Sequence, residues 1–152
     1  MAKKTMFTKV KCFFRKWLSA KIIPSLVLNS ARISLYRLCG YRIGKNVFIG
    51  MHCYLDDLAP ELFTVEDNVT ISYGCYFACH GKYQNHYPIT IKNGAYLGMC
   101  SRVISYKSGG DISGVTIGAK AVIGACTLVN KDIPDGATAV GVPCRIIKEK
   151  NE

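Results

Sequence analysis

The chain has 152 residues, of which 49% are hydrophobic and 20% charged, so it can bury the core of one domain and is not a disordered chain. Its formal net charge of +10 is typical of nucleic-acid-binding proteins, but the charge is unevenly distributed. Residues 1–45 contain eleven Lys and Arg and no Asp or Glu, whereas residues 46–152 carry a net charge of −1. No nucleic-acid-binding motif accompanies the basic segment, so we expect no nucleic-acid partner.

Residues 1–40 are predicted to form a basic helical arm. Apolar residues recur every three or four positions over Phe7–Leu18, with Lys and Arg between them, which predicts an amphipathic helix that ends before Pro24. A second helix is predicted over Ser25–Leu38, and Gly40 ends it.

Two roles for this arm are open from the sequence. We expect residues 25–40 to cap the adjoining end of the next domain, because the end of a stack of strands leaves backbone groups unpaired. Residues 1–20 either extend that cap or contact a membrane surface, where Trp17 and the phenylalanines would enter the lipid and the lysines would meet anionic head groups.

From residue 43 onward, apolar residues recur every six positions in groups of three. The first positions of these hexads are Ile43, Ile49 and Leu55; Val65, Ile71 and Phe77; Ile91, Leu97 and Val103; and Ile117, Ile123 and Val129. A helix repeats near 3.6 residues and a strand near 2, so neither explains this period. Three hexads make one coil of a three-sided solenoid whose first-position side chains point inward. The sequence therefore predicts an all-β solenoid of about four parallel coils.

Insertions between the groups of hexads are expected to form loops at the corners of the solenoid, where binding residues are often carried. The loop that follows Phe77 runs from His80 to Pro88 and contains two of the three histidines. A second loop at residues 107–111 falls one coil later.

The hexads, together with the closing segment that contains Val140-Gly141-Val142-Pro143-Cys144-Arg145, resemble the hexapeptide-repeat acyltransferases. The likeness is greatest to galactoside and maltose O-acetyltransferases and to the O-acetyltransferases of capsule and O-antigen clusters. It implies a left-handed parallel β-helix over residues 41–148, after the α-helical arm and before a tail at 149–152. It also implies a homotrimer with active sites between subunits, acetyl-CoA as acyl donor, a saccharide acceptor, direct transfer in a ternary complex and no metal.

The same resemblance implies that His80 is the catalytic base. Related enzymes carry their base where the inserted loop leaves the wall, ahead of a step like Pro88-Ile89-Thr90-Ile91. A neutral imidazole suits proton removal from an alcohol near pH 7. Gly81 follows His80 where the family has Asp or Pro, which leaves His86 as a competitor, and His52 is a candidate to assist from a neighbouring subunit.

Coenzyme A contacts are implied at small residues that admit its pantetheine arm and at cations that meet its phosphates. Met99 replaces a small polar residue of the family beside these positions. The expected set is Gly98, Ala125, Asn130, Lys131, Arg145 and Lys148.

Acceptor contacts are expected at Asp56 and Asp57, which resemble a Leu-Asp-Asp motif of sugar acetyltransferases. In the loop, Tyr83 and Tyr87 are candidates to stack on a pyranose ring, and His86 is a further candidate acceptor contact.

The eight cysteines are expected to be free thiols in a reducing cytoplasm, because no signal peptide and no Cys-x-x-Cys pair occurs. Cys79 adjoins His80, but neighbours on a strand point to opposite faces, so we expect Cys79 to be a wall residue rather than a nucleophile.

The sequence thus predicts an acetyl-CoA-dependent sugar O-acetyltransferase that is cytoplasmic or peripheral at the inner face of the membrane. Two alternatives are an N-acetyltransferase of an amino sugar or another small acceptor on the same fold, and a non-catalytic hexapeptide-repeat scaffold.

Overall fold

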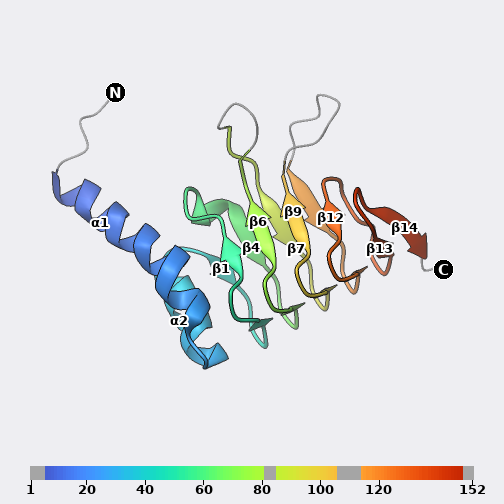
Figure 1. The fold of residues 1–152 in the computed structure, drawn as a ribbon, viewed down its shortest axis with the longest axis horizontal. Helices are drawn as coiled ribbons and strands as arrows, with labels where there is room; N and C mark the ends of the chain where they lie inside the picture. The colour runs from blue at the N-terminus through green and yellow to red at the C-terminus, as the bar shows by residue number, and fades with distance from the viewer. Residues whose placement is uncertain (1–5, 81–84, 106–113, 149–152) are drawn as a thin grey trace.

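The computed structural model describes residues 6–80, 85–105 and 114–148 and places a helical arm at one end of a stack of coiled strands (Figure 1). The arm consists of α1 (Met6–Trp17), a π-helical turn η1 (Leu18–Ile22), a 3-10 turn η2 (Ile23–Ser25) and α2 (Asn29–Leu38).

Short strands form three sheets that run along the stack and enclose its core. Sheet A contains β1 (Arg42–Ile43), β4 (Phe63–Val65), β7 (Ile89–Ile91) and β10 (Val115–Ile117). Sheet B contains β2 (Phe48–Ile49), β5 (Thr70–Ile71), β8 (Tyr96–Leu97), β11 (Val122–Ile123), β13 (Thr138–Val140) and β14 (Arg145–Lys148). Sheet C contains β3 (Tyr54–Leu55), β6 (Tyr76–Ala78), β9 (Arg102–Ile104) and β12 (Leu128–Val129). Between β3 and β4, the chain forms a 3-10 turn, η3 (Pro60–Leu62).

The pairing between coils follows the hexads. Ile49 pairs with Ile71 and Leu55 with Phe77, so equivalent positions of successive hexads stack in register. All strand pairs are parallel except β13 with β14, which closes the far end of sheet B. Four three-strand coils followed by β13 confirm the predicted solenoid of about four coils.

First-position side chains of the hexads fill the interior. Eleven of the twelve are buried, and Ile43, in the first coil, is partly buried. Because each coil adds three inward-pointing apolar residues, the core is a continuous column rather than a single cluster between layers.

Helix α2 covers the first coil through buried polar contacts. The Arg32 side chain is almost fully buried, and its Nε donates to the Ile49 carbonyl at 2.9 Å. The Asn29 side chain accepts a hydrogen bond from Ile49 N–H and donates one to the Val47 carbonyl, each at 3.0 Å. These bonds satisfy backbone groups of β2 that have no preceding coil to pair with.

The second helix begins at Asn29 rather than at the predicted Ser25. Ser25 closes the 3-10 turn η2, and Leu26 and Leu28 are extended. The guanidinium of Arg32 donates to the carbonyls of Leu26 and Val27, which fixes this segment outside the helix. Within the described residues, no helix combines the length and apolar character that a membrane span requires.

Candidate active site

His80 lies where the chain leaves β6 at the corner between sheets C and A, here called the C–A corner. It forms an isolated antiparallel bridge with His86 across the base of the inserted loop, and the two imidazole rings are 6.2 Å apart. The N–H of Tyr87 donates to the Cys79 carbonyl at 2.6 Å. The base of the loop therefore holds His80 against the rigid wall.

Asp56 holds the His80 side chain from the preceding coil. Its carboxylate is fully buried, and Oδ2 lies 2.6 Å from His80 Nδ1. The same oxygen accepts the N–H of Cys79 at 2.7 Å, and Oδ1 accepts the N–H of Leu58 at 2.9 Å. Three donors converge on one carboxylate, so its position and that of the imidazole are fixed together.

This contact sets the tautomer of His80. A carboxylate only accepts hydrogen bonds, so Nδ1 carries the proton and Nε2 is left as a hydrogen-bond acceptor. The His80 side chain is 26% exposed, which leaves it accessible while Asp56 is not. An imidazole oriented in this way can take a proton at Nε2, and the carboxylate stabilises the imidazolium that forms.

Asp56 is fully buried and accepts three protein donors, so in this structure its carboxylate orients His80, and its contact with the acceptor stays a prediction. Asp57 is half-buried and accepts the hydroxyl of Tyr54 at 2.6 Å. Burial, followed by the bond to Asp57, raises the pKa of the Tyr54 hydroxyl above its usual range. Asp57 as an acceptor contact stays a prediction.

The contact between Asp56 and His80 is not among the features expected from the sequence, although the hexad repeat contains a signal for it. Leu55 pairs with Phe77, so Asp56 and His80 both follow strands of sheet C on neighbouring coils. The register of the hexads therefore brings the two side chains to one corner.

Cys79 is a wall residue, as the alternation of strand side chains predicts. It is fully buried, and burial, with a further contribution from the Asp56 charge, raises the pKa of its thiol to about 12. The thiol therefore stays protonated at neutral pH and is a poor nucleophile. All eight cysteines are free, but Cys100 and Cys126 are exposed rather than buried.

Of the residues expected at the coenzyme A arm, Gly98 stays a prediction. It is buried, and a Cβ added there would lie 2.6 Å from the Ala125 backbone nitrogen. Glycine is required at this position so that successive coils can stack. Ala125 and Met99 are exposed at the corner between sheets B and C, the B–C corner, where His52 is also exposed beside Tyr73.

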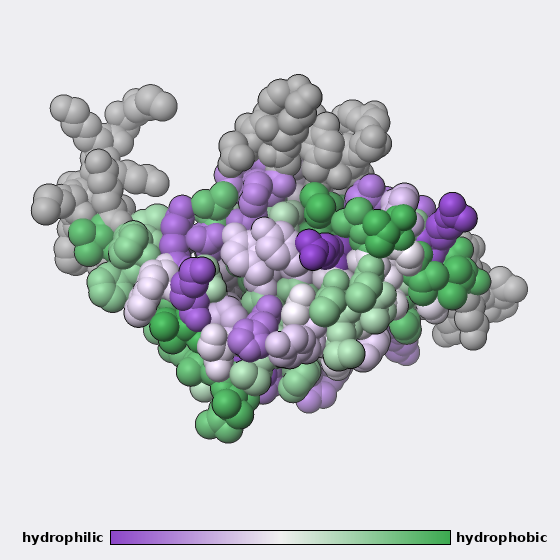
Figure 2. All heavy atoms as spheres, viewed as in Figure 1, coloured by the Kyte–Doolittle hydropathy of each residue, from purple (hydrophilic) through white to green (hydrophobic). Residues whose placement is uncertain are grey.

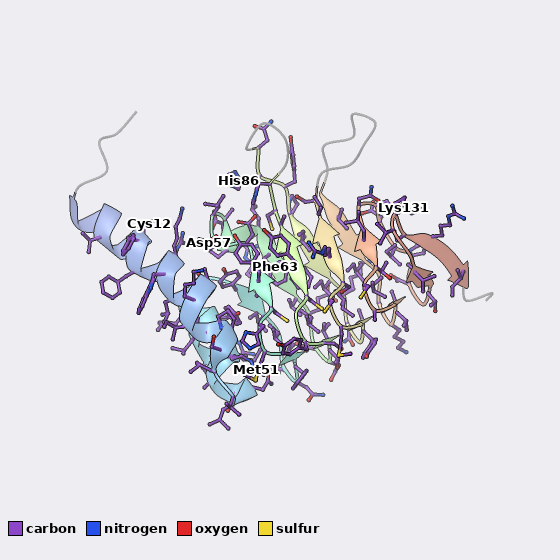
Figure 3. The ribbon with its side chains drawn as sticks, viewed as in Figure 1. Cys12, Met51, Asp57, Phe63, His86 and Lys131 are labelled. Atoms are coloured by element: carbon purple, nitrogen blue, oxygen red, sulfur yellow. The ribbon has the colours of Figure 1, made fainter. Side chains whose placement is uncertain are left out.

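The remaining residues predicted to bind coenzyme A or the acceptor lie in different parts of the structure. Asn130 and Lys131 follow β12 at the C–A corner, where Asn130 is partly buried and Lys131 is exposed, and Arg145 is exposed on β14. Figure 3 shows Asp57, His86 and Lys131 along one edge of the stack and Met51 at the opposite edge. Tyr83 and the side chain of Lys148 lie outside the described residues.

Comparison with known proteins identifies the family. No family model matches the sequence. Galactoside O-acetyltransferase of Escherichia coli (strain K12) is 35% identical over 126 residues, which cover 74% of this chain and 58% of that protein. Among solved structures, galactoside acetyltransferase in complex with coenzyme A has a TM-score of 0.71 at 25% identity, over 99% of this chain and 84% of the other. This chain belongs to the hexapeptide-repeat acetyltransferase family.

The fold of the hexapeptide-repeat acetyltransferases is confirmed over the described residues. The structure of such an enzyme from Vibrio cholerae O1 biovar eltor, complexed with acetyl coenzyme A, has a TM-score of 0.72 and covers 100% of this chain and 93% of the other at 22% identity. The three parallel sheets are therefore those of a left-handed β-helix, preceded by helices as expected. The chain spans little more than half the length of the curated relatives it matches.

The structure of this hexapeptide-repeat protein does not bring the predicted site residues of one chain together. His80 and Lys131 lie at the C–A corner, whereas Ala125 lies at the B–C corner, across sheet C. Two corners of one prism cannot both contact one small ligand. One chain alone therefore does not place all of these residues at a single site.

Proposed function

We propose that this chain catalyses transfer of an acetyl group from acetyl-CoA to a hydroxyl of a saccharide, either a polysaccharide or its precursor. The observation that carries the proposal is the buried Asp56 carboxylate 2.6 Å from Nδ1 of His80. Support for the donor comes from relatives whose structures are complexes with coenzyme A and acetyl coenzyme A. Support for a sugar acceptor comes from the similarity to galactoside O-acetyltransferase.

His80 acts as the general base in the proposed reaction. Its Nε2 takes the proton of the acceptor hydroxyl while the hydroxyl oxygen bonds to the acetyl carbonyl carbon. The carbon–sulfur bond of the thioester then breaks, and the sulfur leaves with the proton returned by His80. Asp56 stabilises the imidazolium between these two steps, and backbone N–H groups stabilise the oxyanion.

We propose a homotrimer in which the C–A corner of one subunit meets the B–C corner of its neighbour. Such packing would bring His80 of one chain to Ala125 of another and complete the site. Phe48, Tyr96 and Val122 support this proposal, because they occupy one register column on the outer face of sheet B and all three are exposed. Apolar side chains aligned on a flat face are typical of a face that is covered in the assembly.

Coenzyme A phosphates would meet cations near the last coil. Lys131 lies just after β12, Arg145 is the first residue of β14, and both are exposed. Lys148 is a third candidate on the same terminal strand. Near His80, Asp57 and the stacked rings of Tyr54 and Tyr76, whose centroids are 4.6 Å apart, offer a carboxylate and aromatic surface to an acceptor.

The test measures coenzyme A released from acetyl-CoA in the presence of galactosides, maltose, an amino sugar and serine. Chromatographic detection is required because Cys100 and Cys126 are exposed thiols that would react with thiol reagents. We expect release that depends on a hydroxyl sugar and a protein that elutes as a trimer by light scattering. Release only with an amine would favour the N-acetyltransferase, and no coenzyme A binding with any acceptor would favour the scaffold.

A further inference from the structure

Helix α1 presents an apolar stripe that no other described residue of the chain covers. Val10, Phe13, Phe14 and Trp17 stand at spacings of three and four, so they share one face of the helix. Their side chains are between 48% and 68% exposed. Figure 2 shows hydrophobic surface gathered over this helical end of the molecule. The arm therefore does more than cap the β-helix.

The opposite face of this segment is the one turned toward the protein. Cys12, Arg15 and Leu18 are partly buried, and Ser19 is buried. An amphipathic helix that only caps a domain would bury its apolar stripe and expose its polar face. Here the apolar stripe stays exposed while Arg15 and Ser19 are turned toward the protein, so the stripe is available to a partner.

Charge identifies the kind of partner. The segment of residues 1–45 contains eleven Lys and Arg and no acidic residue, and Lys16 and Lys21 flank the end of the stripe. Two copies of this arm facing each other would repel, whereas an anionic lipid surface attracts it. Phe and Trp beside Lys and Arg are also the residues that interfacial helices place at the boundary between head groups and acyl chains.

We propose that α1 lies in the interface of an anionic lipid bilayer, with the side chains of Phe13, Phe14 and Trp17 in the acyl boundary and the neighbouring cations on the head groups. The helix projects from the end of the coil stack, so it can lie on a surface without unfolding the β-helix (Figure 1). The stripe lies on α1, a different element from β6, after which His80 lies.

Trp17 is the only tryptophan in the chain, so its fluorescence reports directly on the stripe. The full-length protein is mixed with vesicles of phosphatidylcholine alone or of phosphatidylcholine with phosphatidylglycerol. We expect a blue shift of Trp17 emission and flotation of the protein only with the anionic vesicles. Both should weaken as salt is raised, because the electrostatic attraction is screened.

Variants test whether vesicle binding depends on the α1 stripe or on exposed apolar side chains in general. Phe13→Ser/Phe14→Ser should lower the partition onto anionic vesicles at least about tenfold, because two large apolar groups no longer enter the lipid. Lys16→Gln/Lys21→Gln should lower it and reduce its salt dependence. Ile147→Ser removes a 65% exposed apolar side chain at the other end of the stack and should leave binding unchanged.

Two outcomes would overturn the proposal. One is wild-type protein whose Trp17 emission is unchanged by anionic vesicles. The other is a Phe13→Ser/Phe14→Ser variant that no longer forms the oligomer of the wild type but keeps its vesicle binding, which would make the stripe a contact between copies. All substituted side chains in these variants are on the arm or exposed, and thermal unfolding checks that each variant is folded.

Discussion

Replacement of His80 by alanine is expected to lower kcat for acetyl transfer about 10²- to 10⁴-fold, the range typical of losing a general base. The imidazole is the group at the C–A corner that combines an oriented nitrogen with partial exposure. Because the side chain is not part of the core, the variant should fold and bind coenzyme A as the wild type does. Steady-state release of coenzyme A, measured by chromatography, gives the rate, and calorimetric titration gives the affinity.

His86→Ala is the matched control for this experiment. His86 lies across the bridge from His80, with its ring 6.2 Å away, but it is exposed and makes no contact with Asp56 among the described residues. We expect a kcat close to that of the wild type and at most a change in the KM for the acceptor. An undiminished kcat in His80→Ala, or a loss of activity in His86→Ala alone, would show that His80 is not the general base.

The second large effect is expected at Asp56. Asp56→Asn keeps the shape of the side chain, but its amide cannot accept from Cys79, Leu58 and His80 together, because one of its two polar atoms is now a donor. The imidazole then loses its fixed tautomer and the charge that stabilises its protonated form. We expect kcat to fall about 10²-fold or more, with little change in the KM for acetyl-CoA.

A structural role alone would give a different result. Thermal unfolding of Asp56→Asn will show a loss of stability, since a buried donor is left unpaired at a cost of about 1–3 kcal/mol. Asp56 acts on the reaction only through His80, so adding Asp56→Asn to His80→Ala should not lower kcat further. An additive loss in the double variant, or a wild-type kcat in Asp56→Asn, would show that Asp56 does not position the base.

Much of the fold follows from local sequence periodicity. Hexad first positions such as Ile71, Leu97 and Ile123 are buried because six residues carry the chain from one inward position to the next. The corner loops are equally predictable, since a stacked coil can admit extra residues only where it turns. The family resemblance added the handedness and the position of His80.

Other features depended on contacts between coils. The role of Asp56 required the register that places it beside His80, and the buried position of Gly98 required the close approach of the next coil to its Cα. The start of α2 at Asn29 is fixed by the Arg32 guanidinium, a contact within the cap that no local signal encodes. The outward orientation of the α1 stripe follows from how the arm docks, because periodicity alone gives a face but not its direction.

The central claim is that His80, held by Asp56, works on acetyl-CoA bound at a corner completed by a second subunit. A crystal structure of the protein with coenzyme A tests it most directly. We predict a trimer in which the thiol of coenzyme A approaches Nε2 of His80 to about 4 Å or less, a distance at which proton transfer and acyl transfer can share one site. Coenzyme A bound with its sulfur far from every copy of His80, or bound within a single subunit, would contradict it.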